Sequence, residues 1–197
     1  MSEHKHHHHG YKFNPALVER LRDPERLQFT NPDAVWAILA TRPVTTLVDL
    51  GAGIGFFAIP FARKIPAGRV YACDTSAEML AHLQAALAEQ HVGNVTPLRS
   101  EEVRVPLPDH EADVVFMANL HHELDHPQES LRECLRLLKP GGTVAIVDWK
   151  PDPTPKGPPA EVRIPPETVR AQLMEAGFHA VASHPILPYH YFLTAQA

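Results

Sequence analysis

The sequence has few cysteines, no excess of basic charge and no long apolar run. Its 197 residues include only two cysteines, Cys73 and Cys134, which are too few for a disulfide framework or a thiolate metal cage. Lysine and arginine total 18 against 23 aspartates and glutamates, so the electrostatic footprint of a nucleic-acid-binding protein is not expected. No apolar run approaches the roughly 20 residues of a membrane span, and no secretory signal follows the start. We therefore expect a cytoplasmic protein without nucleic-acid or membrane partners.

Proline and histidine, in contrast, are abundant, with 20 and 14 residues. Residues 1–10 form a His-rich tail, which is an expression tag, a native low-complexity tail or a metal-binding tract, and we set it apart from the fold. Seven prolines fall between Pro151 and Pro166, which indicates a stiffened, irregular connection rather than a domain linker. The expected organisation is the tail, an N-terminal helical lid over 11–43 and a domain over 44–197 that includes the lid.

Strand-like and helix-like segments alternate through most of the chain. Asparagine followed by proline predicts the start of two short helices, at Asn14 and Asn31. Thr75 and Glu78 are expected to form a capping box for a helix. Further helices are expected from Gly55 for about ten residues, from Pro127 to a stop at Pro140-Gly141-Gly142, and over 166–176. Strands are expected over 44–50, 69–73, 94–99, 112–118 and 143–149, with the 94–99 strand at an edge because it contains Pro97.

Two strands close the chain, roughly over 178–186 and 189–196, with only two residues between them. A connection this short requires an antiparallel hairpin, because parallel neighbours need a crossover. The fold class predicted is therefore α/β, with a doubly wound, mostly parallel, seven-stranded sheet and an antiparallel strand in a C-terminal hairpin.

The segment VDLGAGIG, residues 48–55, stands between an expected strand and an expected helix. Gly51 and Gly53 let the backbone turn sharply and approach a ligand closely. Asp74 ends the second strand, where its carboxylate can accept hydrogen bonds from both hydroxyls of a ribose. A dinucleotide fingerprint requires a third glycine where this chain has Phe56, so the pattern disfavours a nicotinamide cofactor.

These motifs resemble those of the class I S-adenosylmethionine-dependent methyltransferases, over roughly residues 44–196. Within that family the chain is most similar to the small ubiquinone and menaquinone C-methyltransferase type. The resemblance implies a Rossmann-like sheet whose seventh strand is antiparallel, in agreement with the hairpin inferred above. Besides VDLGAGIG, it is carried by VYACDTSAEML at 70–80, VPLPDHEADVVFMANLHHEL at 105–124, LRLLKPGGTVAIVDW at 135–149 and LMEAGFHAV at 173–181.

The resemblance also implies S-adenosylmethionine as the cofactor and suggests which residues contact it. Glu101 would accept a hydrogen bond from the adenine amine, with Ser100 and Glu102 as alternatives in register. A core role for Met79 and a solvated loop position for Glu101 remain competing interpretations. The remaining contacts would be Asp49, Gly51 and Gly53 at the amino-acid end, Asp74 at the ribose, Met79 against the adenine and Asn119 along the methionine side.

Histidines follow the expected fourth strand in the segment HHELDH, residues 121–126. His122 to His126 match the H-E-x-x-H pattern of zinc proteases, but that site needs one continuous helix and Pro127 is predicted to start the helix. No metal is therefore expected. His121 and His122 lie at the carboxyl edge of the sheet and are candidate general bases or acceptor contacts. Asp148 and Trp149, at the end of the fifth strand, are expected to hold the acceptor there.

The predicted function is transfer of a methyl group from a sulfonium to a small-molecule acceptor by in-line displacement. A lid this short suits a small acceptor. Two other classes stay open: a protein that binds S-adenosylmethionine without catalysis, and a nicotinamide-dependent oxidoreductase, which Phe56 and the terminal hairpin oppose. The acceptor, the atom methylated and the oligomeric state, a homodimer included, are left open.

Overall fold

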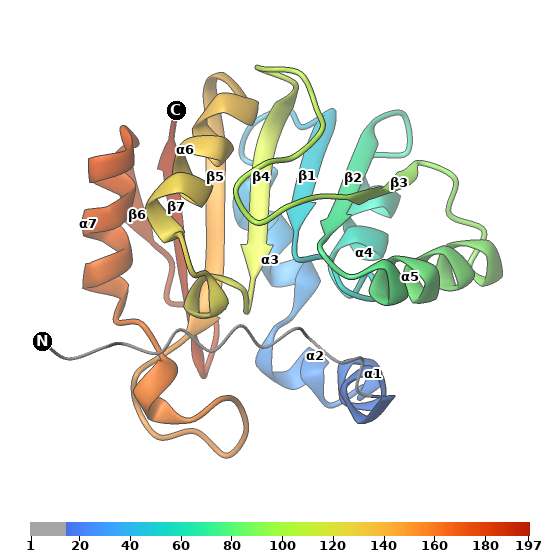
Figure 1. Ribbon diagram of the computed structural model, residues 1–197, viewed down its shortest axis with the longest axis horizontal. Coiled ribbons are helices and arrows are strands. Elements are labelled where there is room, and N and C mark those ends of the chain that lie inside the picture. The colour runs from blue at the N-terminus through green and yellow to red at the C-terminus, as the bar shows by residue number, and fades with distance from the viewer. Residues whose placement is uncertain (1–14) are drawn as a thin grey trace, which may run out of the picture.

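The computed structural model describes residues 15–197, which form one seven-stranded sheet with helices on both faces (Figure 1). The strand order is β3-β2-β1-β4-β5-β7-β6. Only the pairs β5–β7 and β6–β7 are antiparallel among the strands described. The strands are β1 (Thr46–Leu50), β2 (Arg69–Asp74), β3 (Val95–Arg99), β4 (Ala112–Ala118), β5 (Leu138–Trp149), β6 (His179–Ser183) and β7 (His190–Gln196). This arrangement confirms the predicted fold class, including the edge position of the strand that contains Pro97.

Nine helical segments surround the sheet in the described part of the chain. Three of them precede β1, where the sequence predicted two. The α-helices are α1 (Pro15–Arg22), α2 (Arg26–Phe29), α3 (Pro32–Leu39), α4 (Ala58–Lys64), α5 (Ala77–Glu89), α6 (Pro127–Leu137) and α7 (Pro166–Ala176), and the 3-10 helices are η1 (His121–Glu123) and η2 (Ala160–Val162). No helix in this part of the chain is both long and apolar enough to cross a membrane.

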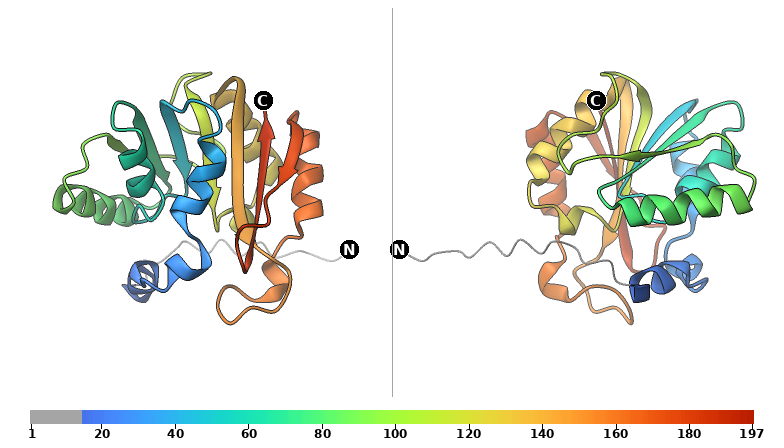
Figure 2. Two further views of the ribbon diagram at one scale, coloured as in Figure 1. Left: turned by 180° about the vertical axis from the view of Figure 1, so that it is seen from behind. Right: turned by 45° about the vertical axis from the view of Figure 1, so that its right-hand side comes forward.

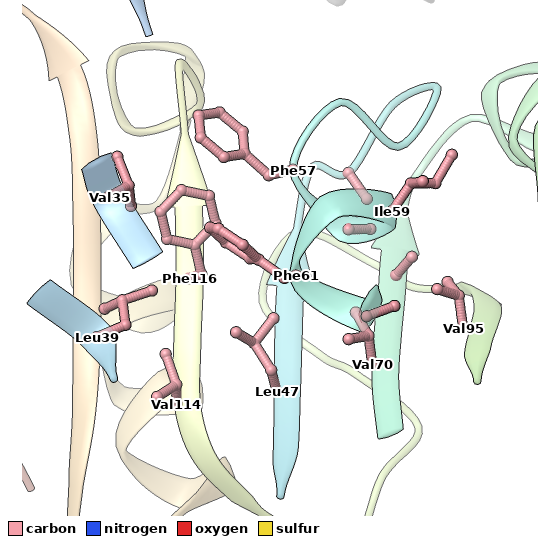
Figure 3. Close-up of a cluster of buried hydrophobic side chains, with 14 of the residues drawn as sticks. Val35, Leu39, Leu47, Phe57, Ile59, Phe61, Val70, Val95, Val114 and Phe116 are labelled. Carbon is pink, nitrogen blue, oxygen red and sulfur yellow. The ribbon is translucent and has the colours of Figure 1, made fainter. Parts of the chain in front are cut away.

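Two hydrophobic clusters hold the helices against opposite faces of the sheet. Helices α3, α4 and α5 pack on one face, around Phe57, Phe61 and Phe116 (Figure 3). The rings of Phe57 and Phe116 lie 4.8 Å apart, a tilted contact that adds to the free energy of burial. Helices α6 and α7 pack on the other face, where Leu131 and Leu173 are fully buried. With both faces covered, the carboxyl ends of the parallel strands are left as the place for a site.

Several boundaries differ from the prediction. The predicted cap Thr75 is wrong: Ser76 is the N-cap of α5, and its Oγ accepts a hydrogen bond from the N–H of Met79 at 3.2 Å. Asp74 causes the shift, because its Oδ1 accepts from the N–H of Ser76 at 2.8 Å and delays the helix by one residue. Asn31 does cap α3, as predicted. The predicted cap Asn14 and the tail 1–10 lie outside the described residues.

The last strands and the start of β5 also differ from the prediction. β6 is shorter than expected, and six residues rather than two connect it to β7. Ala180 has a φ of +51°, which coincides with a break in the β6–β7 register. β5 begins at Leu138, directly after α6, and runs through the glycine pair that was expected to separate the two elements. Gly141, at φ +74°, permits the irregular pairing there.

A loop without a helix connects β3 to β4 over residues 100–111 and is clamped by α6. The guanidinium of Arg136 donates to the carbonyls of Val105 at 3.1 Å and Leu107 at 2.9 Å. Glu133 accepts from the N–H of Val105 at 2.8 Å and pairs with Arg136. These bonds satisfy backbone groups that a helix would otherwise satisfy internally. They also fix the course of the chain after β3, where Glu101 lies.

Two segments lie beyond the carboxyl ends of the parallel strands (Figures 1 and 2). These are the helices α1 and α2 and the proline-rich segment 150–165, drawn in blue and orange. Lys156 of the proline-rich segment forms ion pairs with Asp23, at 3.3 Å, and with Glu25. The ring of Phe29 lies 5.4 Å from that of Tyr189. The two segments therefore contact each other and the end of the sheet.

Candidate functional site

The turn after β1 is built by glycines in left-handed conformations. Gly51, Gly53 and Gly55 have φ values of +66°, +53° and +88°. A Cβ on Gly51 would come within 2.9 Å of the side chain of Leu120, so the turn lies against the residue that follows Asn119. The N–H of Ala52 donates to the carbonyl of Cys73 at 3.0 Å. The turn is thereby fixed between the end of β2 and the residue that follows Asn119.

Asp74 joins the glycine turn to the start of α5. Its Oδ2 accepts from the N–H of Gly53 at 2.8 Å, while its Oδ1 accepts from Ser76. Burial raises the pKa of Asp74, although these N–H donors oppose that effect. Met79, in the first turn of α5, is 8% exposed, yet it belongs to neither of the two hydrophobic clusters. The side chain of Met79 is therefore buried outside both clusters, and its contact with adenine stays a prediction beside the core role.

Two buried acceptor atoms lie at the ends of β1 and β4. Asp49 is 2% exposed, and its Oδ2 has no hydrogen-bond partner within the described residues. Burial raises the pKa of Asp49 well above its usual range, even though the N–H of Ala58 donates to the carboxylate. The Oδ1 of Asn119 is likewise buried and without a partner among the residues described. Such acceptors suit a ligand that brings N–H donors, as the ammonium of an amino acid does.

Asn119 also has an unusual backbone. Its φ of +55° is left-handed, and its N–H donates to the carbonyl of Val147 at 2.8 Å. Left-handed asparagine is tolerated better than most residues, because its short polar side chain fits there. The chain turns away from the sheet at this residue and leads directly into η1 and its two histidines.

Three residues after β3 were candidates for the adenine contact, and they differ in their hydrogen-bond partners and exposure. The carboxylate of Glu102 accepts from the N–H of His126, the residue that precedes α6, at 2.6 Å. Ser100 donates its N–H to the carbonyl of Asp74 at 3.1 Å, which brings this segment beside the end of β2. Of the three candidates, Glu101 is therefore the one whose side chain is exposed.

The two candidate histidines face different partners. His122 lies against β5, where its Nδ1 is 2.8 Å from Oδ1 of Asp148. Burial alone would lower the pKa of His122, but the hydrogen bond to Asp148 and its charge outweigh burial and raise it. His121 is fully buried, and its Nε2 lies 2.8 Å from Oε1 of Gln172 on α7. Burial lowers the pKa of His121. Of the two, only His122 is joined to another residue predicted for the site.

The H-E-x-x-H pattern does not form a metalloprotease site. η1 ends at Glu123, Leu124 is extended, and α6 starts at Pro127, so His122 and His126 do not share a helix. Within residues 15–197, no group of three or more histidine, cysteine or carboxylate side chains is arranged to hold a metal ion.

Glu123 is the site residue that sequence reasoning missed. Its Oε1 lies 3.8 Å from Nε2 of His122. Burial raises the pKa of Glu123, and the charges of Asp148 and Asp74 add to this effect, while His122 opposes it. The carboxylate of Glu123 is therefore next to His122 and close enough to Asp148 and Asp74 to respond to their charges. Its position after the fourth strand was the available signal, but Glu123 was considered only as part of a zinc motif.

The expected acceptor residues at the end of β5 are already engaged. The carboxylate of Asp148 is bonded to His122, and the indole of Trp149 lies 4.0 Å, centroid to centroid, from the ring of His190. The proline-rich segment covers Trp149, since a Cβ on Gly157 would come within 2.9 Å of the indole. A pocket of about 290 Å³ opens beside them, and Asp152, Glu167 and Tyr191 are among the residues that line it.

Comparisons with known proteins agree with this geometry. A family profile described as a methyltransferase domain matches residues 48–146, about half of the chain. A ubiquinone/menaquinone biosynthesis C-methyltransferase from Ectopseudomonas mendocina is 32% identical over 110 residues, which cover 55% of this chain and 43% of that protein. The match thus spans less than half the length of this curated relative.

Solved structures extend the match to the whole sheet. The crystal structure of an S-adenosylmethionine-dependent methyltransferase from Aquifex aeolicus superposes with a TM-score of 0.88 at 34% identity, covering 94% of this chain and 99% of that one. The cyclase SpnF superposes with a TM-score of 0.71 at 20% identity, covering 84% and 78%, and shows the fold alone. By family profile, identity and fold, the chain belongs to the methyltransferase-domain family, as a class I S-adenosylmethionine-dependent methyltransferase.

Proposed function

We propose that the protein transfers a methyl group from S-adenosylmethionine to a small-molecule acceptor by in-line displacement. The observation that carries the proposal is the carboxylate of Asp74, which is held against the glycine turn by the N–H of Gly53. A carboxylate in this position can accept from ribose hydroxyls while it remains bonded to the backbone.

The remaining cofactor contacts follow from the same edge of the sheet. S-adenosylmethionine, when bound, supplies a methyl carbon on a positively charged sulfur. Its amino-acid end would lie against the glycine turn, with the unpartnered oxygens of Asp49 and Asn119 as acceptors for the ammonium. Met79 and Glu101 would contact the adenine, one by packing and the other by accepting from the exocyclic amine. Met79 is in the helix whose cap, Ser76, is bonded to Asp74, and Glu101 follows Ser100, which bonds to the carbonyl of Asp74.

His122, rather than His121, is the histidine we assign to the acceptor side. His121 is fully buried against α7 and bonded to Gln172, so it has no surface to offer a substrate. His122 lies beside Glu123 and Asp148 at the carboxyl edge. Positioning the acceptor and the methyl group together supplies most of the rate in such a displacement.

The cover of the site supports a small acceptor. We assign the lid role to residues 11–43 together with segment 150–165, on the contacts that join the described parts of the two at Lys156. The net charge of −5 gives no reason to expect a nucleic acid. The cytoplasmic location stays a prediction, and the identity of the acceptor and the oligomeric state stay open.

A fold match alone does not establish methyl transfer, since a cyclase shares the fold, and the test must therefore measure turnover. Isothermal calorimetry with S-adenosylmethionine, S-adenosylhomocysteine and NADH comes first, and we expect micromolar binding of the two sulfur ligands only. Release of S-adenosylhomocysteine with a panel of hydroxyl and amine acceptors comes second. Binding without turnover over a broad panel would favour a protein that binds S-adenosylmethionine without catalysis. Binding of NADH alone would favour the alternative function, a nicotinamide-dependent oxidoreductase.

A further inference from the structure

His122 and Asp148 form a buried pair that joins η1 to the end of β5. Besides the bond between Nδ1 and Oδ1, the N–H of His122 donates to Oδ2 of Asp148 at 3.1 Å. Their side chains are only 6% and 1% exposed. The histidine is thus held at its backbone and at its ring by one carboxylate, away from competing water, where such bonds are strongest.

The donors around Asp148 determine which ring nitrogen carries hydrogen. Oδ1 also accepts from the N–H of Trp149 at 2.8 Å, so both oxygens of the carboxylate face N–H donors. An ionised carboxylate is acceptor-only, and its partner on His122 must therefore be Nδ1–H. In the neutral ring this leaves the lone pair on Nε2.

We propose that Asp148 is a positioning residue that holds His122 with Nε2 as the general base, and that the acceptor is a molecule whose nucleophilic atom carries a proton, a hydroxyl or an amine. This inference rests on the proposed function. As the acceptor oxygen or nitrogen bonds to the methyl carbon, the carbon–sulfur bond breaks and its electron pair stays on sulfur. The acceptor proton passes to Nε2, and Asp148 stabilises the imidazolium that results.

The charges that face His122 support this role. Asp148 on β5 and Glu123 on η1 favour the imidazolium, whereas Arg163, after η2, opposes it. His121, the neighbouring ring, feels His122 as a like charge when both are protonated. Burial, the largest single influence, lowers the pKa of His122, yet the net result is a raised pKa. A raised pKa strengthens the base and moves the acid limb of a rate profile to higher pH.

His121 is the internal comparison for a structural histidine. It is buried and hydrogen-bonded like His122, but its partner, Gln172, is a neutral amide. The hydrogen bond to Gln172 raises the pKa of His121, but burial outweighs it and the net pKa is lowered, whereas the bond to the carboxylate of Asp148 and its charge leave the pKa of His122 raised. Replacing Asp148 and, separately, Gln172 therefore tests whether only the carboxylate partner changes the pKa of His122.

The direct test is ¹H–¹⁵N NMR of histidine-labelled full-length protein across pH, with the His122 signal identified by its loss in His122→Gln. We expect Nδ1–H and a free Nε2 in the neutral ring. Asp148→Asn, which keeps the size of the side chain, should lower the pKa of His122, whereas the control Gln172→Met should leave it unchanged. An unshifted pKa in a folded Asp148→Asn protein, or a hydrogen on Nε2 in the wild type, would overturn the proposal.

Turnover with an acceptor found in the panel gives the second readout. Asp148→Asn should lower kcat about 100-fold and move the acid limb of the pH profile downward, while the Kd for S-adenosylmethionine stays within about twofold. If kcat fell but the acid limb of the pH profile did not move, the role of Asp148 would be purely structural. That result would contradict the proposal. Failure of the proposed function is a separate result, since it appears as absent cofactor binding in the wild type. The NMR experiment tests the hydrogen bond between His122 and Asp148 whether or not turnover is found.

Discussion

The carboxylate of Asp74 accepts a hydrogen bond from the backbone N–H of Gly53 at 2.8 Å, across the gap between the ends of β1 and β2. One side chain thus sets the position of the glycine turn and that of Ser76, the cap of α5. The two segments assigned to the cofactor are therefore arranged relative to each other in the protein itself. Such pre-organisation lowers the entropy lost on binding.

Asp74→Ala should therefore weaken binding of S-adenosylmethionine by at least about tenfold, because it removes the ribose acceptor and releases the glycine turn. Calorimetry measures the loss directly. Asp113→Ala is a matched control, since Asp113 also accepts from backbone N–H groups, those of Thr45 and Thr46, but at the amino ends of β1 and β4. We expect that variant to lose stability and keep its affinity. Equal losses of affinity in the two variants would contradict the assignment of Asp74.

Gly51→Ala should reduce both stability and cofactor affinity. The φ of +66° costs an alanine about 1 kcal/mol, and the new Cβ would press on Leu120 at 2.9 Å. Gly93→Ala is the comparison, because Gly93 has no positive φ and a Cβ there meets no described atom within 4 Å. Its stability should stay within about 0.5 kcal/mol of the wild type. Thermal unfolding measures the effect on stability, and calorimetry measures the effect on affinity. Wild-type affinity in Gly51→Ala would mean that the glycine turn does not contact the cofactor.

The sheet could be predicted because its signals are local. Buried strands read as apolar runs, Pro97 marks an edge, and a short connection between the last two strands requires an antiparallel pair. The site was predicted where strands end, so Asp74 and the glycine turn were expected together. Boundaries were less certain: Thr75 and Ser76 both carry a hydroxyl that can cap a helix, and only the bond from Ser76 to Asp74 decides between them.

Pairings between distant segments were not predictable. β4 and β5 are parallel neighbours, so His122 and Asp148 were expected at one edge of the sheet. Which of His121 and His122 faces β5 depends on η1, a 3-10 turn that no periodic pattern announces. The ion pairs of Lys156 with Asp23 and Glu25 are equally invisible in the sequence, because they depend on how two irregular segments meet.

Acid should weaken the protein partly through Asp113. Burial raises the pKa of this carboxyl, but Lys139 and the N–H groups of Thr45 and Thr46 outweigh it and bring the pKa down to about 2 from 3.8. A depressed folded-state pKa adds stability that is present above pH 3.8 and disappears as the pH falls through 2. Asp113→Asn should therefore be less stable than the wild type at pH 6, and the difference should shrink between pH 4 and 2. A difference independent of pH, measured by denaturant unfolding, would exclude this account.

Lys156 should control the opening of segment 150–165. Its ion pairs with Asp23 and Glu25, and its position 5.6 Å from the ring of Phe29, tie this segment to the N-terminal helices. Exposed pairs of this kind contribute about 0–1 kcal/mol, so Lys156→Glu should leave the global melting temperature almost unchanged. Amide hydrogen exchange in 150–165 should instead accelerate about twofold to fivefold, because opening of the segment becomes easier.

Lys64→Glu is the control for this experiment, because Lys64 is similarly exposed and pairs with Asp33 at 2.8 Å, outside the contact between the two segments. That variant should not change exchange in 150–165.

Reversing the charges of the partners as well, with Asp23→Lys and Glu25→Lys added to Lys156→Glu, should restore slow exchange. The attraction depends on opposite charges and not on which segment carries the positive one. High salt should speed exchange in the wild type toward that of Lys156→Glu. If neither salt nor charge reversal changed the exchange rate of 150–165, Lys156 would not control the segment. Packing of Gly157 against Trp149 would then hold it in place.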